Sequence, residues 1–303
     1  MQTFYASLVW LLLFLPLAGG AQTTAGKENP ANFRIISYNI WNGFEKDTAR
    51  RVKFIDWVKE QDPDVLALTE LVGFTEKDLA GLAAAYGHPY VSIVKEGGYP
   101  VGVSSKKPLE VVTKQVEGFW HGFLHVRTYG LDVLVTHLSP FEWKFRLKEA
   151  QAITAYIREN RLDSCLLMGD LNAYSPFDAE EVEKRALLYE TMRKWDAEQK
   201  EYRNMRGDRY DYSVLSEFLS TGLADVCRMY VPAPKRISFP AAFLMGWEHT
   251  DPRLPQKGER LDYILVSPAL VPACVNAYIY NGEENEGISD HYPVGADLAL
   301  PDR

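Results

Sequence analysis

The stretch Leu166–Asn172, which reads LLMGDLN, decides how the fold of this 303-residue chain is interpreted. An apolar run with the character of a strand leads into Gly169, where the chain can turn sharply or let a ligand approach the backbone. Because side chains of an extended segment alternate between two faces, we expect Asp170 and Asn172 to point the same way. Such a carboxylate and amide can orient a water molecule and hold a phosphate oxygen. An ordinary turn after a strand is the alternative.

The composition indicates a folded chain with a sizeable core, arranged as one large domain or two small ones. Hydrophobic residues make up 47% of the sequence, and the net charge is −8. An acidic chain is poorly matched to a long polyanion such as duplex DNA. The cysteines are Cys165, Cys227 and Cys274; no pair has metal-ligand spacing, and their odd number allows at most one disulfide.

The first residues are typical of an export signal. An apolar run, Leu8–Leu17, precedes small residues that end at Ala21, which is the pattern of a secretory signal peptide cleaved after that alanine. The run is short for a membrane span, but an uncleaved anchor is the alternative because no Lys or Arg precedes it. We therefore expect a signal peptide over 1–21, a disordered leader over 22–32, and one folded domain over 33–303 that is exported to the periplasm or secreted.

Apolar periodicity predicts alternating strands and helices up to residue 170. The first helix has Asp47 as its N-cap, with Val52, Ile55 and Val58 on its apolar face. Several short strands follow in succession, which favours antiparallel pairing there. The predicted elements are strands at 33–40, 65–68, 90–94, 101–105, 109–113, 123–128, 131–137 and 164–168, and helices at 47–61, 75–86 and 143–157.

The second half of the chain is less regular. Residues 178–222 are predicted to be mostly helical, and the prolines between 228 and 258 exclude a long regular element there. Strands are expected at 261–267 and at about 273–280, and a last strand closes near Leu300. We expect a single α/β domain with two layers of sheet and helices outside.

Polar residues recur at or beside the ends of these apolar runs, where rigid elements hold catalytic groups and loops expose them. Each residue alone has an ordinary explanation as a turn cap, a surface carboxylate or a core histidine. Their shared position favours a common site. The residues are Asn39, Glu70, His137, Asp170, Asn172, Asp262, Asp290 and His291.

The motifs around these residues resemble those of the endonuclease/exonuclease/phosphatase superfamily, which includes DNase I-like nucleases, inositol polyphosphate phosphatases and neutral sphingomyelinases. The resemblance covers residues 33–300, and the motifs occur in the family's order. It implies a four-layer α/β sandwich in which two mixed β-sheets are flanked by helices. The motifs are SYNIWN (37–42), LTEL (68–71), VTHL (135–138), GDLNA (169–173), RLDYILVS (260–267) and SDHYPV (289–294).

The resemblance also implies a divalent metal ion. Glu70 would be its main ligand, with Asn39 and Asp290 nearby. Such an all-oxygen set suits Mg²⁺ or Mn²⁺, which commonly bridge a protein to a substrate phosphate.

The resemblance implies catalytic roles for five further residues. Asp170 would orient or deprotonate the attacking water, and Asn172 would hold a non-bridging phosphate oxygen. His291 would be the general acid/base, with its tautomer fixed by Asp262. His137 would donate a hydrogen bond to the phosphate. The direction of proton transfer between Asp170 and His291 stays open.

Departures from the family bear on the substrate. Repair enzymes similar to exonuclease III have an acidic residue and a tyrosine where this chain has Trp41 and His137, which disfavours abasic-site repair. Secreted sphingomyelinases share the histidine, but their aromatic membrane hairpin corresponds here to the acidic stretch 279–288, which an anionic membrane surface would repel. The aromatic loop 239–247 is an alternative membrane contact, although we expect it to pack against the body.

We therefore expect an exported, metal-dependent phosphoesterase that acts on a phosphorylated small molecule or a nucleic acid. A secreted DNase I-like nuclease and then a sphingomyelinase-like phospholipase C are the alternatives. A catalytically inactive binding module is disfavoured, because every expected polar position is filled. No obligate protein partner is indicated, and membrane contact is not favoured.

Overall fold

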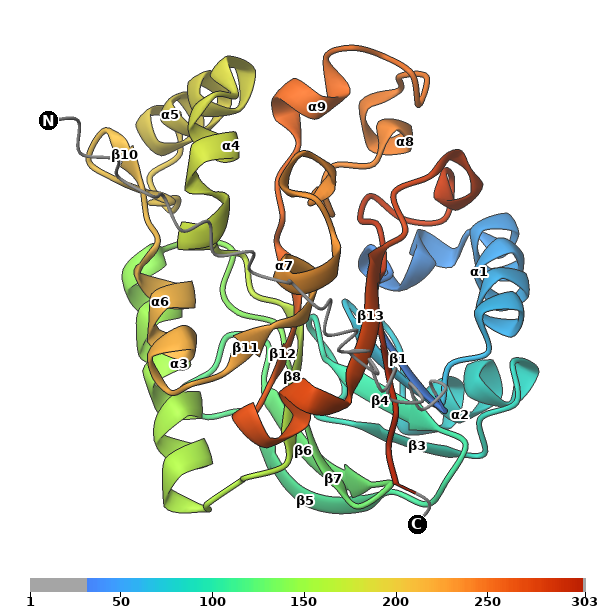
Figure 1. Ribbon diagram of the computed structural model, residues 1–303. Helices are drawn as coiled ribbons and strands as arrows, with labels where there is room; N and C mark the ends of the chain where they lie inside the picture. Colours follow the sequence, from blue (N-terminus) through green and yellow to red (C-terminus); the bar gives the residue numbers. More distant parts are fainter. Residues whose placement is uncertain (1–31, 302–303) are drawn as a thin grey trace, which may run out of the picture.

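Two six-stranded β-sheets pack face to face and helices cover their outer faces, which confirms the expected four-layer α/β sandwich (Figure 1). The computed structural model describes residues 32–301. The predicted signal peptide, and the predicted leader up to residue 31, lie outside this range. Within the described range, none of the helices has the length and apolar character needed to cross a membrane.

The first sheet has the strand order β13-β14-β1-β2-β4-β3 and is mixed. Strands β1 and β2 pair in parallel, and the other neighbours are antiparallel. The strands are β1 (Phe33–Asn39), β2 (Val65–Thr69), β3 (Tyr90–Ile93), β4 (Gly102–Ser105), β13 (Cys274–Ile279) and β14 (Val294–Leu298).

The second sheet has the order β11-β12-β8-β7-β6-β5 and is also mixed, with β7 and β8 in parallel. Its other neighbours are antiparallel, and for β5–β6 and β6–β7 this confirms the pairing that the succession of short strands predicted. The strands are β5 (Glu110–Gln115), β6 (Phe123–Thr128), β7 (Leu131–Thr136), β8 (Cys165–Asp170), β11 (Ala224–Asp225) and β12 (Asp262–Val266).

Helices α1 (Thr48–Gln61) and α2 (Glu76–Ala85) pack on the first sheet, and α3 (Trp143–Glu159) and α6 (Ser213–Ser220) pack on the second. Apart from α5, which has 13 residues, the remaining helices and the hairpin strands are short, and in Figure 1 several of these elements lie above the sheets. They are α4 (Ala179–Glu183), α5 (Ala186–Glu198), β9 (Met205–Arg206), β10 (Arg209–Tyr210), α7 (Val226–Tyr230), α8 (Ala242–Met245) and α9 (Leu254–Lys257), with 3₁₀ turns at Asn42–Lys46, Pro176–Asp178, Ala233–Lys235, Pro268–Ala273 and Glu283–Asn285.

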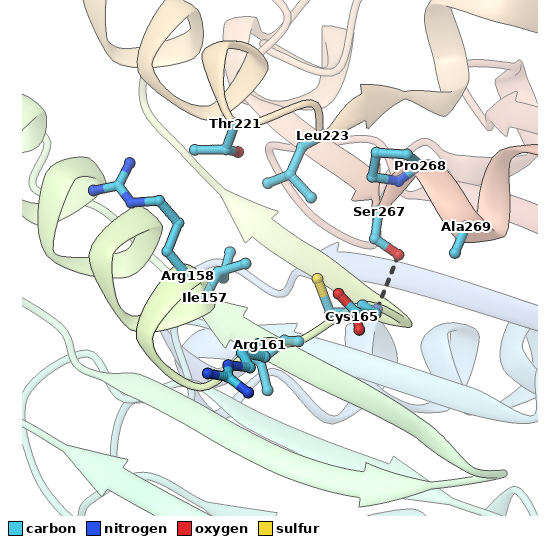
Figure 2. A pocket seen from close by; sticks show the side chains of 11 residues that line it. Ile157, Arg158, Arg161, Cys165, Thr221, Leu223, Ser267, Pro268 and Ala269 are labelled. Carbon is cyan, nitrogen blue, oxygen red and sulfur yellow. Dashed lines mark hydrogen bonds between the residues drawn. The ribbon is translucent and has the colours of Figure 1, made fainter.

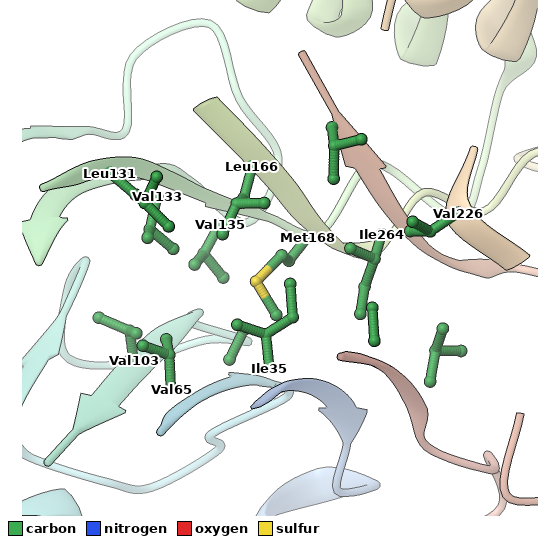
Figure 3. Close-up of a cluster of buried hydrophobic side chains, with 14 of the residues drawn as sticks. Ile35, Val65, Val103, Leu131, Val133, Val135, Leu166, Met168, Val226 and Ile264 are labelled. Carbon is green, nitrogen blue, oxygen red and sulfur yellow. The ribbon is translucent and has the colours of Figure 1, made fainter. Parts of the chain in front are cut away.

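The main core lies between the sheets and is built from alternate residues of their strands (Figure 3). Ile35 and Val65 of the first sheet face Val135 and Met168 of the second across this layer. The intervening residues, such as Ile36, face outward into a separate cluster under α1 and α2. Strands that are buried on both faces read as continuous apolar runs. This burial explains why a strand such as LLM before Gly169 is apolar at every position.

The predicted elements up to residue 170 are confirmed to within two residues. The prediction for the apolar face of α1 is wrong in one respect. Val52 is 56% exposed, whereas Phe54, Trp57 and Val58 are buried. Val52 and Val58 are six residues apart. They therefore lie roughly 120° from each other around the helix and cannot share a narrow face.

Two further outcomes concern the second half of the chain. Residues 178–222 are mostly helical as predicted, but the β9–β10 hairpin interrupts them, and its two-residue strands are too short for periodicity to reveal. All three cysteines are buried and unpaired.

Candidate active site

The predicted polar residues meet where β1, β2, β7 and β8 end and β12 begins. Asn39, the last residue of β1, joins the two sheets through its side chain. Its Nδ2 donates to Glu70 Oε1 of the first sheet at 3.1 Å and to Asp170 Oδ2 of the second at 3.1 Å. The fold thus gathers groups that are 131 positions apart in the sequence into one site.

Glu70 follows β2 in a left-handed backbone conformation with φ of 60°. Its Oε2 accepts a hydrogen bond from the backbone N–H of Asn42 at 2.9 Å, and its Oε1 accepts the bond from Asn39. A non-glycine residue in this conformation costs of order 1–3 kcal/mol, and such strain concentrates at functional sites. The backbone therefore holds this carboxylate in one direction.

Asp290 lies beside these residues in the turn before β14. Burial raises the pKa of Asp290 to about 6; the His291 charge opposes this shift and the Glu70 carboxylate adds to it. The neighbouring Ser289 hydroxyl donates to the backbone carbonyl of Asn39 at 2.7 Å, which fixes this turn against β1. A buried carboxylate and a partly buried one that repel each other are a setting that a divalent cation would stabilise.

Asp170 ends β8 directly opposite Asp262, the first residue of β12. Burial raises the pKa of Asp170 to about 8, and the nearby Asp262 carboxylate contributes in the same direction. The preceding Gly169 has φ of 140°, and a Cβ atom there would lie 1.8 Å from the carbonyl oxygen of Thr136. The close approach of β7 and β8 at this point therefore requires glycine before the aspartate.

His291 bridges the two aspartates. Its Nδ1 lies 2.8 Å from Asp262 Oδ2, and its Nε2 lies 3.8 Å from Asp170 Oδ2. Burial alone lowers the pKa of His291, but the carboxylates of Asp262 and Asp290 outweigh burial and hold this pKa well above its usual value. The ring therefore donates through Nδ1 to Asp262 and presents Nε2 toward Asp170.

The ligand atoms of Asp170, Asp262 and His291 lie within 4.8 Å of one another, so this trio could itself hold a metal ion. However, Asp262 Oδ2 and His291 Nδ1 are already engaged with each other at 2.8 Å. A carboxylate that fixes the tautomer of a histidine is the usual arrangement of an acid–base pair. The geometry therefore favours proton transfer over metal ligation for these three residues.

His137 lies on the other side of Asp170, with its Nε2 3.5 Å from Asp170 Oδ2. Its ring stacks on that of His121 with centroids 4.1 Å apart and an interplanar angle of 24°. Among the described residues, His137 Nδ1 and His121 Nε2 are buried nitrogens without a hydrogen-bond partner. Burial is the main reason that the pKa values of both rings are lowered, to about 3 for His121.

His121 is a residue that the sequence analysis missed. It precedes β6, next to Gly122 with φ of 112°, and is 4% exposed. A histidine beside a glycine at a strand end is a weak signal. Its importance appears only when β6 pairs with β7 and brings its ring against His137.

The prediction that strand alternation makes Asp170 and Asn172 point the same way is wrong. The strand ends at Asp170, and Asn172 has a left-handed backbone with φ of 47°, so alternation along a strand does not apply. A tight turn brings the residues together instead, because Asn172 N donates to Asp170 Oδ1 at 2.9 Å. The Asn172 side-chain amide donates to the Leu138 carbonyl at 3.0 Å, which leaves its second N–H for another acceptor.

A cavity of about 580 Å³ lies at the far end of β8 and does not belong to this site (Figure 2). Its lining includes Cys165, Ser267 and Arg158. Cys165 begins β8 and Asp170 ends it. The two residues are therefore separated by roughly 16 Å of extended chain.

The model of the endonuclease/exonuclease/phosphatase family matches residues 36–291. An AP endonuclease from Archaeoglobus fulgidus has a similar structure, with a TM-score of 0.63 at 20% identity over 89% of this chain and 100% of that chain.

Two Neisseria structures are also similar. The 3′ phosphatase NExo bound to a product DNA hairpin has a TM-score of 0.62 at 20% identity over 89% of this chain and 100% of its own. The 3′-5′ exonuclease NExo from Neisseria meningitidis has the same TM-score and identity over 88% and 100% of the two chains. These structures support the fold, and the family match spans most of the sequence. This chain belongs to the endonuclease/exonuclease/phosphatase family.

Proposed function

We propose that this protein is an exported, metal-dependent phosphoesterase that hydrolyses a phosphodiester or phosphomonoester by attack of water. The observation that carries this proposal is the buried arrangement of His291 between Asp262 and Asp170, at 2.8 and 3.8 Å. Such an arrangement supplies a histidine of fixed orientation, whose charged form is favoured by nearby carboxylates, next to a carboxyl group whose raised pKa lets it exchange protons near neutral pH.

The residues fit a divalent cation. Glu70, Asn39 and Asp290 would hold Mg²⁺ or Mn²⁺, since their oxygens are ligands that these ions prefer. Burial is the main cause of the raised pKa of Asp290 and the Glu70 carboxylate adds to it, so a cation held by both carboxylates would stabilise their charged forms. When bound, the ion would polarise a phosphoryl oxygen and offset charge in the transition state.

The protein side chains would orient the water, transfer the proton and bind the phosphate oxygens. Asp170 would orient the attacking water, and His291 would move a proton through Nε2 while Asp262 holds Nδ1. His137 would donate a hydrogen bond to a phosphate oxygen through Nε2, since its ring stays neutral and buried. The free N–H of Asn172 would hold a second oxygen.

The substrate is proposed to be a phosphorylated small molecule or a nucleic acid. Similar structures are nucleases and a 3′ phosphatase, which supports the nucleic acid. The net charge of −8 supports the smaller substrate. A steep fall of turnover with salt concentration would favour the nucleic acid, because phosphate contacts release counterions.

Membrane contact is the less favoured alternative. The aromatic loop 239–247 packs against the body at its start, where Ala241 N donates to the Asp290 carbonyl at 2.7 Å. Phe243 is 43% exposed, but it lies against the ring of Trp41 with centroids 6.1 Å apart. Turnover confined to vesicles or micelles would support a phospholipid substrate instead.

The test uses purified protein with Mg²⁺, Mn²⁺ or a chelator, together with bis-p-nitrophenyl phosphate and p-nitrophenyl phosphate. We expect metal-dependent release of p-nitrophenol, and we expect His291→Ala to lower kcat by about 10²–10⁴-fold. His88→Gln is the control, because His88 is buried and bonded to Ser104 and Pro63 away from the site. Absence of turnover on these and natural phosphoesters with any divalent metal would refute the proposal.

Export is tested separately. Mass spectrometry of protein recovered from the periplasm or the culture medium should show a mature chain that begins at Gln22. A chain that retains residues 1–21 in the membrane fraction would support the uncleaved anchor.

A further inference from the structure

A cavity of about 170 Å³ lies beside the candidate site, and none of the steps above uses it. One wall comes from α5 and the other from the segment that leads into α8. Most of the lining is apolar, including Met192, Trp195, Phe239, Leu244 and Met245.

Phe239 connects this cavity to the catalytic histidine. Its ring lies against that of His291, with centroids 4.7 Å apart. A group in the cavity would therefore be separated from His291 by the thickness of a single side chain.

The wall that carries Phe239 is held firmly to the site. The Ser238 hydroxyl oxygen accepts hydrogen bonds from the backbone N–H groups of Leu261 and Asp262, at 3.0 and 3.1 Å. The Ser238 carbonyl accepts the N–H of Tyr292 at 2.7 Å. The cavity wall and the acid–base pair therefore belong to one hydrogen-bonded unit, which favours a fixed position for a group bound there.

The charges of the two ionisable residues that line the cavity partly offset each other. Glu259 is 5% exposed and accepts a hydrogen bond from the Tyr174 hydroxyl, while Lys257 contributes a positive charge to the lining. Burial raises the pKa of Glu259 to about 7, so near neutral pH Glu259 balances only part of the Lys257 charge, and the space is mostly apolar with a weak positive charge. It offers few partners for the polar edge of a nucleobase, and Lys257 disfavours a cationic head group.

We propose, on the basis of the function proposed above, that this cavity binds an apolar alcohol portion of the phosphoester substrate, of the size of one aromatic ring. Cavities of about 150 Å³ with apolar walls accept benzene. Two methionines give the wall some adaptability, and small-molecule sites are commonly apolar with a few polar groups. The site would thus select phosphoesters of neutral aryl or similar apolar alcohols.

The first experiment measures binding without catalysis. Carbon-13 methyl spectra of the protein labelled at methionine are recorded while benzyl alcohol is added. We expect shifts at Met192 and Met245, which line the cavity, and none at Met168 in the core or at the exposed Met229. Unchanged signals from Met192 and Met245 at millimolar benzyl alcohol would overturn the proposal.

The second experiment measures selectivity. Benzyl phosphate is compared with methyl phosphate, and benzyl methyl phosphate with dimethyl phosphate, because the two alcohols have similar acidity. We expect the benzyl ester to have a kcat/KM at least about tenfold higher than the methyl ester. Leu244→Trp, which fills the cavity, should bring the ratio of the two kcat/KM values close to one. Leu187→Trp is the matched control, because Leu187 lies on the same α5 helix as Met192 but does not line the cavity.

The two experiments separate this proposal from the proposed function. Methionine shifts without hydrolysis of any ester would refute the phosphoesterase while leaving an apolar site in place. Hydrolysis of methyl and benzyl esters at equal rates, without methionine shifts, would overturn the apolar site while leaving the phosphoesterase. Retention of the benzyl preference in a folded Leu244→Trp variant would also contradict the assignment.

Discussion

Replacement of Gly169 by alanine tests whether the contact between β7 and β8 sets the position of the candidate site. The new Cβ atom would lie 1.8 Å from the carbonyl oxygen of Thr136, whereas ordinary van der Waals contact begins at 3.4 Å. The strands must therefore separate by more than an ångström beside Asp170 and His137.

The expected cost has two parts. Alanine at φ of 140° adds backbone strain of about 1–3 kcal/mol. Separation of the strands leaves one or two buried backbone groups poorly bonded, at about 1–3 kcal/mol each. The sum is roughly 2–9 kcal/mol, and a middle value of about 5 kcal/mol corresponds to a fall in Tm of about 10–20 °C for a domain of this size.

Thermal unfolding followed by circular dichroism measures this change, and turnover is measured well below the new Tm. Gly207→Ala is the matched control, because Gly207 also has a positive φ of 65° but has no atom within 4 Å of the new Cβ. The control should lose only about 1–2 kcal/mol. If Gly169→Ala melts within about 2 °C of Gly207→Ala and keeps full activity, the close approach does not constrain the site.

Three other substitutions test individual roles. Asp262→Asn should lower kcat by about 10²–10⁴-fold and move the His291 limb of the pH–rate profile to lower pH, because loss of the carboxylate lowers the His291 pKa; an unchanged profile contradicts the pairing. Glu70→Gln should raise the Mg²⁺ concentration for half-maximal activity by about tenfold or more, so a wild-type titration curve would exclude Glu70 as a ligand. Burial lowers the His121 pKa to about 3 in the folded state, against about 6.5 in the unfolded chain. Below about pH 6.5 the unfolded state therefore binds more protons than the folded state, and the free energy of unfolding falls with acidification. In urea unfolding, the free energy of unfolding of the wild type should fall between pH 7 and about pH 5, and this fall should be about 2 kcal/mol smaller in His121→Phe. An equal fall in both proteins would contradict this titration.

The sequence was sufficient for the order of elements up to residue 170 and for most of the candidate residues. Strands buried on both faces must be apolar along their whole length, so polar residues such as Glu70 and Asp170 mark where these strands end. The motifs assign family roles to these positions, because several separate segments of the chain match the family's motifs in the same order. Hence the sandwich could be predicted, and Asn39, Asp262 and His291 could be named, before any contact was known.

Two details could not be predicted from the sequence: which face of a helix is buried, and how the chain turns after a strand. The buried face of α1 is set by Phe54 and Trp57 packing against the sheet, and the pairing of Asp170 with Asn172 is set by a left-handed turn. Periodicity describes regular segments, and it carries no information on how a chain turns after one ends.

Only the tertiary structure brought together groups that are distant in the sequence. The Asn39 amide bridges Glu70 and Asp170 across two sheets, His121 stacks on His137, and Phe239 lies against His291. Local sequence determines which segments form strands and helices, because that choice depends on neighbours within a few residues. Which side chains touch is decided by the packing of whole sheets, and burial in that packing is also the main cause of the raised pKa of Asp170 and the lowered pKa of His137.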